Sequence, residues 1–263
     1  MIDTHAHIDF ETFEQDRQAV IERFFAFRGK ALINVGVDLE ADEKVLFLAG
    51  FYKKIFVSLG LHPGEAKSIF LENKQAIEEK FARFFSLVNH KKVVAIGETG
   101  LDYFHSKGAE ERLLQKKLFL MQINLAKEKK LPLIIHCRDA YADVLEMLSG
   151  YEGKFVMHCY GGSLEDTKKF LKFPLAFFSF TGNITYAKPE AEINEVIRFI
   201  PLERIMLETD CPFLAPVPQR GKRNEPAFLV HTLEALARIK KVDVDLVEEV
   251  TDKNAISFFG LAL

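Results

Sequence analysis

The 263-residue sequence predicts an α/β protein with a TIM (β/α)8 barrel as a single domain over residues 1–263. Short apolar runs alternate with longer helical patterns from end to end. Near-continuous apolar strands joined by helices are typical of a parallel sheet buried on both faces. Eight such units in about 240 residues suit the size of a barrel. A doubly wound open sheet is the alternative that this pattern leaves open.

The expected elements follow in order along the chain. Runs rich in branched and apolar residues predict strands at 1–4, 31–37, 55–61, 93–98, 132–137, 154–159, 175–181 and 204–209. Helical periodicity predicts helices at 15–28, 40–53, 70–89, 110–130, 139–149, 163–172, 189–199, 225–240 and 243–259. The longest irregular piece after a strand, residues 211–224, is rich in Pro and Arg and is expected to be an active-site loop.

Composition limits the classes of function. The formal net charge of −3 gives no reason to expect strong nonspecific binding of nucleic acid, so a polyanion would have to be held locally. No apolar run approaches the roughly 20 residues of a membrane span, and no signal peptide is evident. The three cysteines, at 137, 159 and 211, are too far apart for a disulfide framework. These features predict a cytoplasmic protein without a membrane partner.

Metal-binding side chains cluster at predicted strand ends. His5 and His7 are two residues apart at the first strand, so their side chains point the same way. Taken singly, a histidine at a strand end is more often a core residue, and a carboxylate there is often a helix cap. In a barrel, however, the carboxyl ends of the strands converge on one face. The expected metal ligands are His5, His7, Glu98, His136, His158 and Asp210.

Six ligands are too many for one tetrahedral ion and suit two divalent ions. The candidate metals are zinc, magnesium and manganese. His5, His7 and Asp210 are expected to hold one ion, and His136 with His158 the other.

Glu98 is the best candidate to bridge the two ions. Such a pair of ions suits phosphoester hydrolysis by attack of a metal-bound water. Asp210 would accept the proton of that water as general base. Glu208, on the same strand face, would orient a ligand or the water.

Three further residues are candidates for binding substrate. His62 ends the third strand, and Arg138 lies near the fifth. Arg223 belongs to the compact basic tract 220–223, and a surface ion pair with Glu225 is its alternative role. Guanidinium groups favour phosphate because they bind it in a bidentate way. Three histidines in helical or loop positions are given no role: His90, His105 and His231.

A set of motifs that runs from residue 3 to residue 226 resembles the TatD family of metal-dependent deoxyribonucleases, within the amidohydrolase-like superfamily. The motifs are Asp3-Thr-His-Ala-His-Ile-Asp-Phe10, Gly60-Leu-His-Pro63, Ile96-Gly-Glu-Thr-Gly-Leu-Asp-Tyr103, Leu133-Ile-Ile-His-Cys-Arg-Asp-Ala140, His158-Cys-Tyr-Gly-Gly-Ser163, Phe178-Ser-Phe-Thr-Gly-Asn183, Leu207-Glu-Thr-Asp-Cys-Pro-Phe213 and Arg220-Gly-Lys-Arg-Asn-Glu-Pro226.

The resemblance implies a TIM barrel, a divalent-metal centre and cleavage of DNA, often as a 3′–5′ exonuclease, with the same six ligands. Glu98 stands where many amidohydrolases carry a carboxylated lysine, which favours the nuclease branch. Thr99 and Cys211 depart from the residues common in the family, which leaves substrate preference open.

Two other functions compete with a DNA phosphodiesterase. A metal-dependent ester or amide hydrolase, such as an aminoacyl-tRNA deacylase, would use the same attack on a carbonyl carbon. A barrel that binds metal or a partner without catalysis is disfavoured, because the ligand set is complete and Asp210 can act as a base.

Overall fold

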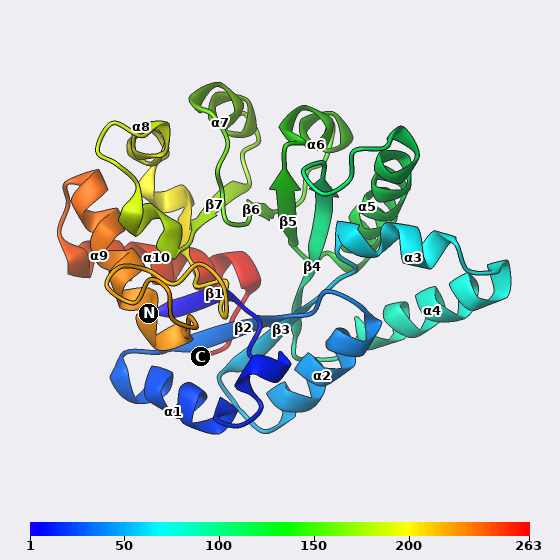
Figure 1. Cartoon of the computed structure of the whole chain (residues 1–263), viewed down its shortest axis with the longest axis horizontal. Coiled ribbons are helices and arrows are strands. Elements are labelled where there is room, and N and C mark those ends of the chain that lie inside the picture. Colours follow the sequence, from blue (N-terminus) through cyan, green and yellow to red (C-terminus); the bar gives the residue numbers. More distant parts are fainter. The chain divides into compact units, whose positions relative to one another are not determined.

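A computed structural model describes all 263 residues. It comprises two compact parts, which we call the terminal unit (residues 1–34 and 158–263) and the central unit (residues 35–157). Strands and helices alternate along the chain (Figure 1). The sheet has eight strands in chain order, from β1 to β8.

All eight predicted strands are present. Their bounds are β1 Ile2–Ala6, β2 Ala31–Val35, β3 Ile55–Leu59, β4 Val93–Asp102, β5 Leu133–Arg138, β6 Phe155–Met157, β7 Ala176–Phe180 and β8 Ile205–Leu207. The α-helices are α1 Arg17–Phe27, α2 Leu39–Gly50, α3 Ala66–Phe70, α4 Lys74–Leu87, α5 Ala109–Lys129, α6 Tyr141–Met147, α7 Leu164–Phe170, α8 Glu192–Phe199, α9 Leu229–Lys240 and α10 Val244–Phe259.

Within the terminal unit, β1 has a neighbour on each side. It pairs with β2 in parallel, with Ile2 opposite Ala31. On the other side, Ala6 forms a parallel bridge with Cys211, just after β8. An eight-stranded parallel sheet whose first strand meets the end of its last has the topology of a TIM barrel, so the predicted fold class is confirmed. The assignment of residues 1–263 to one domain stays a prediction.

Within the central unit, β4 is longer than the sequence predicts. It pairs with β3 and β5 and continues to Asp102, with a shift of register between Ile96 and Thr99. Gly97 and Gly100 have φ angles of +156° and +135°, which only glycine adopts without strain. These glycines allow the strand to continue through the backbone irregularity at this register shift. The expectation that Glu98 ends its strand is therefore wrong, because Glu98 lies inside β4.

The predicted helix at 70–89 corresponds to α4, which begins four residues later than expected, and a separate short helix, α3, precedes it. α3 ends at Phe70, and the side chain of Asn73 accepts a hydrogen bond from the Ala76 amide to begin α4. Asparagine at this position satisfies an amide that the first helical turn leaves without a partner. At 225–240, a short 3₁₀ turn over Pro226–Phe228 precedes α9. The segment 211–224 is irregular, as expected.

None of the helices combines the length and the apolar character needed to cross a membrane. No disulfide bond joins the three cysteines.

Candidate metal centre

The terminal unit gathers five of the predicted site residues into one group, which we call the first cluster: His5, His7, His158, Glu208 and Asp210. The Nε2 atoms of His5 and His7 are 3.1 Å apart. Asp210 Oδ1 lies 3.8 Å from His5 Nε2 and 3.4 Å from His7 Nε2. The ring of His158 stacks on that of His5, with 3.6 Å between the ring centroids. Four of the six predicted ligands therefore converge.

Backbone contacts between the start of the chain and the segment after β8 hold the first cluster together. The Asp210 amide donates to the His5 carbonyl at 2.9 Å, and the His7 amide donates to the Cys211 carbonyl at 2.9 Å. The two segments are thus fixed on either side of the facing histidine and aspartate side chains.

The buried Asp3 links the same two segments through hydrogen bonds. Its carboxyl group accepts hydrogen bonds from the Thr209 amide at 3.0 Å and the Thr209 hydroxyl at 2.6 Å, and a longer one from the His5 amide. Burial raises the pKa of Asp3 to about 7 in spite of these hydrogen bonds. Asp3 is not among the site residues expected from the sequence, although it begins the Asp3-Thr-His motif.

Glu208 is the carboxylate that lies beside His158. Its Oε1 lies 2.9 Å from His158 Nδ1 and accepts the Cys159 amide at 2.6 Å. Its Oε2 accepts the Ser179 hydroxyl at 2.6 Å. A carboxylate beside Nδ1 is the usual arrangement around a metal-binding histidine, whose Nε2 then faces the ion. Here Nε2 faces Asp210 Oδ1 at 3.9 Å.

Asp210 stays ionised at neutral pH. Burial would raise its pKa, but the hydrogen bond with His7 and the charge of His158 outweigh burial and lower the pKa below its ordinary value. An ionised carboxylate among imidazoles can hold a cation or accept a proton.

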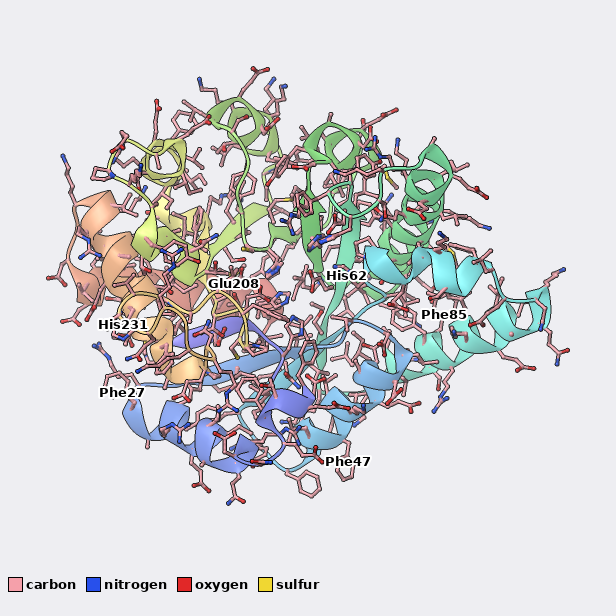
Figure 2. The ribbon with its side chains drawn as sticks, viewed as in Figure 1. Phe27, Phe47, His62, Phe85, Glu208 and His231 are labelled. Carbon is pink, nitrogen blue, oxygen red and sulfur yellow. The ribbon has the colours of Figure 1, made fainter.

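The central unit contains a second cluster, formed by His62, Glu98 and His136, with Asp102 and His105 behind them. His136 Nδ1 lies 2.8 Å from Glu98 Oε1, and His62 Nε2 lies 3.7 Å from the same oxygen. Figure 2 labels His62, which follows β3. The close approach of β3 to β4 needs a glycine at position 60, because a Cβ atom there would lie 2.4 Å from the Gly97 carbonyl carbon.

His62 is oriented as a donor. Its Nδ1 accepts the Gly64 amide at 3.1 Å, so in the neutral ring the proton is on Nε2, which faces Glu98. This tautomer suits a contact with a carboxylate or substrate oxygen better than ligation of a metal through Nε2.

Asp102 contacts the far side of His136. Its Oδ2 lies 3.1 Å from His136 Nε2 and 2.9 Å from His105 Nδ1, and its Oδ1 accepts the His105 amide. Burial would raise the pKa of Asp102, but the hydrogen bonds with these two histidines hold it well below its usual range. Neither His105 nor Asp102 is indicated by the sequence pattern, although Asp102 follows Glu98 by four residues.

The basic residues predicted to bind substrate differ in their surroundings. Arg223 is held by Asp16 through a bidentate pair of 2.9 and 2.6 Å. Glu225, the partner considered from sequence, pairs with Arg23 instead. Arg138 is exposed at the end of β5. A role in binding substrate stays a prediction for Arg138, Arg223 and His62.

Both clusters have donors that fit a divalent cation. In the first, the donor atoms of His5, His7 and Asp210 lie within 4.8 Å of one another, as do those of His5, His158 and Glu208. In the second, potential donor atoms of His62, Glu98 and His136 lie within the same limit, but the tautomer of His62 leaves Glu98 and His136 as the better ligands. Imidazole and carboxylate together suit zinc and manganese, and magnesium less readily.

Comparison with known proteins agrees with this chemistry. The model of a family described as "TatD related DNase" matches residues 2–260. An uncharacterized metal-dependent hydrolase of Bacillus subtilis, YabD, is 38% identical over 264 residues and covers 99% of both chains. A protein of Salmonella typhimurium named "3'-5' ssDNA/RNA exonuclease TatD" is 30% identical over 266 residues, which is 98% of each chain. The crystal structure of YjjV, a TatD homologue of Escherichia coli, superposes with a TM-score of 0.88 at 28% identity and covers 100% of this chain and 98% of that one.

Proposed function

Because this chain belongs to the TatD-related DNase family and is a metal-dependent hydrolase, we propose that it cleaves phosphodiester bonds of DNA, as a 3′–5′ exonuclease. The observation that carries the proposal is the first cluster, in which three imidazoles face one ionised carboxylate. The printed name of the Salmonella relative supports a nucleic-acid substrate.

We propose that each cluster holds one divalent ion. His5, His7, His158 and Asp210 would hold the ion of the terminal unit, and Glu98 with His136 the ion of the central unit. When bound, a divalent ion makes water more acidic and offsets charge on phosphoryl oxygens. Bridging by Glu98, and a single ion shared by His136 and His158, stay predictions.

The side chains around these ligands would have distinct tasks. Asp210, whose low pKa keeps it ionised, would accept the proton of the attacking water. Glu208 would act as a positioning residue through His158. In the second cluster, Asp102 is placed to orient His136 in the same way.

A phosphate-bearing substrate is favoured by one cation near the second cluster. Arg138 lies two residues after His136 on β5, so the two side chains share a strand face. Arg223 could bind a substrate phosphate only after its ion pair with Asp16 is broken.

The test is an assay of the purified protein with Mg²⁺, Mn²⁺ or Zn²⁺. End-labelled single- and double-stranded DNA would be offered beside a panel of carboxylic esters and an aminoacyl-tRNA. We expect stepwise shortening of DNA from its 3′ end, complete loss of hydrolysis in EDTA, and up to two ions per chain by elemental analysis.

Hydrolysis of the esters or the aminoacyl-tRNA with DNA left intact would overturn the DNA assignment and favour the acyl hydrolase. Full activity in chelator, or no bound metal after reconstitution, would overturn the metal-dependent mechanism itself.

A further inference from the structure

An exposed aromatic ring lies beside the second cluster and is contacted by two cationic side chains. Phe104 follows β4, two residues after Asp102, and is 46% exposed. The guanidinium carbon of Arg138 lies 3.7 Å from the Phe104 ring centroid, and Lys107 Nζ lies 5.1 Å from it. A phenyl ring in this setting presents an apolar surface next to positive charge.

Neither cation is neutralised by a carboxylate. Arg138 and Lys107 take part in no ion pair, whereas Arg223 is paired with Asp16 at 2.6 Å. Both side chains are exposed, so they can turn from the ring toward an anion without breaking a salt bridge. In this respect the two side chains differ from Arg223, which would first have to leave Asp16.

The ring is fixed close to the proposed metal ligands by strand pairing. Asp102 lies opposite Arg138 in the register of β4 and β5, and Gly100 lies opposite His136. The Tyr103 amide donates to the Arg138 carbonyl at 2.8 Å. Asp102 also contacts His136, at 3.1 Å. Phe104, two residues after Asp102, therefore lies at the edge of the second cluster.

We propose that Phe104, Arg138 and Lys107 form a nucleotide subsite, in which Phe104 stacks on an unpaired nucleobase and the two cations contact its phosphate. The inference rests on the proposed nuclease function and names a substrate contact for it. Aromatic rings that stack on bases beside basic side chains are the usual means of holding single strands without reading sequence.

The subsite favours a single-stranded end over a blunt duplex. A base in a duplex is already stacked and paired, and it must leave that stack before it can cover Phe104. A base on an unpaired end avoids most of this cost. We therefore expect the protein to bind and shorten single strands more readily than blunt duplexes.

Fluorescence provides a direct test, because the chain contains no Trp. Phe104→Trp keeps a ring that stacks and introduces a single indole. The metal-loaded variant would be titrated with a single-stranded oligonucleotide whose phosphorothioate linkages resist cleavage. We expect saturable quenching of the indole emission, and much weaker quenching with the blunt duplex.

The matched control is Phe47→Trp. Phe47 lies on α2, is 73% exposed and points into solvent (Figure 2). We expect no saturable quenching for this variant. Equal quenching at the two positions, or none at either, would overturn the subsite.

Truncation measures how much the subsite contributes. Phe104→Ala should raise the Kd for the single strand about five- to a hundred-fold, in line with the loss of one stacked base. Phe104→Trp should restore the affinity. For a single strand whose terminal nucleotide lacks its base, the wild type and Phe104→Ala should have the same Kd, because no base is present to stack on the ring.

Arg138→Ala should weaken binding for every sequence and lower the slope of log K against log salt by about 1, because one phosphate contact is lost. In the cleavage assay, both variants should raise KM more than they lower kcat. Arg238→Ala, at an exposed arginine on α9, is the control and should match the wild type.

These outcomes separate the two proposals. If the wild type cleaves DNA and Phe104→Ala keeps its Kd and KM, the subsite is wrong and the nuclease function stands. If the wild type neither binds nor cleaves DNA, the nuclease function fails and the subsite fails with it.

Discussion

Two carboxylates of the first cluster have different surroundings, which suit them to the different tasks proposed above. Glu208 accepts hydrogen bonds from the Cys159 amide and the Ser179 hydroxyl, and it contacts Nδ1 of His158. A carboxylate held in this way orients a ring. Asp210 instead faces the Nε2 atoms of three histidines. Variants of the two residues should therefore fail in different ways.

Asp210→Asn should abolish most of the turnover. Asparagine keeps an oxygen of similar size, but it cannot accept a proton at neutral pH, so kcat should fall by roughly 10²–10⁴. Metal content must be measured alongside, because a weaker ligand can also lower activity. Near-normal turnover with both ions bound would refute the role of Asp210 as general base.

Glu208→Gln should act through His158. The amide keeps the shape of the side chain but removes the charge that makes the ring a better donor, so affinity for metal should fall roughly 10- to 100-fold. Calorimetric titration with Zn²⁺ measures the change without any substrate. Glu234→Gln is the control, since Glu234 also approaches a histidine Nδ1, at 3.7 Å, but is 56% exposed. An unchanged Zn²⁺ affinity for Glu208→Gln would contradict the positioning role.

The sequence pattern indicates the candidate ligands but not all of the contacts around the site, for a physical reason. A side chain at a strand end follows from local pattern, and His158 directly follows β6 as expected. His136 was expected to end its strand, but it lies inside β5, two residues before its end. The pairing of Arg223 with Asp16 joins residues 207 positions apart and depends on how the 211–224 loop folds back. No local pattern encodes such a contact, so Glu225 was considered in its place.

At the scale of single elements, β4 shows how two glycines set the geometry of a site. A Cβ atom at Gly100 would lie 2.0 Å from the carbonyl oxygen of His136, and φ is +135° there. The strand therefore approaches β5 more closely than a side chain would permit. A pattern of alternating apolar residues cannot reveal this approach, and so the strand was predicted to end at Glu98.

Gly100→Ala should destabilise the protein and disturb the second cluster. Strain at a positive φ costs about 1–3 kcal/mol, and the clash with the His136 backbone adds to it. Urea unfolding measures the free energy, and titration with Zn²⁺ measures the affinity of the site. Gly108→Ala is the control, because nothing lies within 4 Å of a Cβ atom there and φ is negative. Equal free energies of unfolding for the two variants would contradict this prediction, because they would show that the β5 backbone moves to accommodate the added methyl group.

At the scale of the whole chain, a group of ion pairs in the terminal unit joins residues from opposite ends of the sequence. Glu248 on α10 pairs with the Arg28 guanidinium and lies 3.0 Å from the Met1 amino group. Lys30 pairs with Asp252, one turn along α10, at 2.7 Å. The group thereby fastens the last helix to the start of β1 and β2. Only the folded chain brings these residues together, so a sequence pattern could not predict it.

Glu248→Gln should lower stability in a pH-dependent way. Burial would raise the pKa of Glu248, but the hydrogen bond and charge of the Met1 amino group, together with Arg28, lower it below its ordinary value of 4.5. A carboxyl with a lowered pKa stabilises the fold above pH 4.5, and this contribution is lost as pH falls through the folded-state pKa.

The variant should therefore be less stable than the wild type by about 1–3 kcal/mol at pH 7, the usual loss for hydrogen bonds to a charged group. The gap between the two proteins should close as the pH falls below 4.5, because protonation then removes the same charge from the wild type. Urea unfolding of both proteins at pH 7, 5 and 3.5 measures the gap. Glu249→Gln, at an exposed pair with Lys253 of 3.9 Å, should change stability little at any of these pH values. A gap that stays constant across this range would mean that Glu248 contributes through packing and not through its charge.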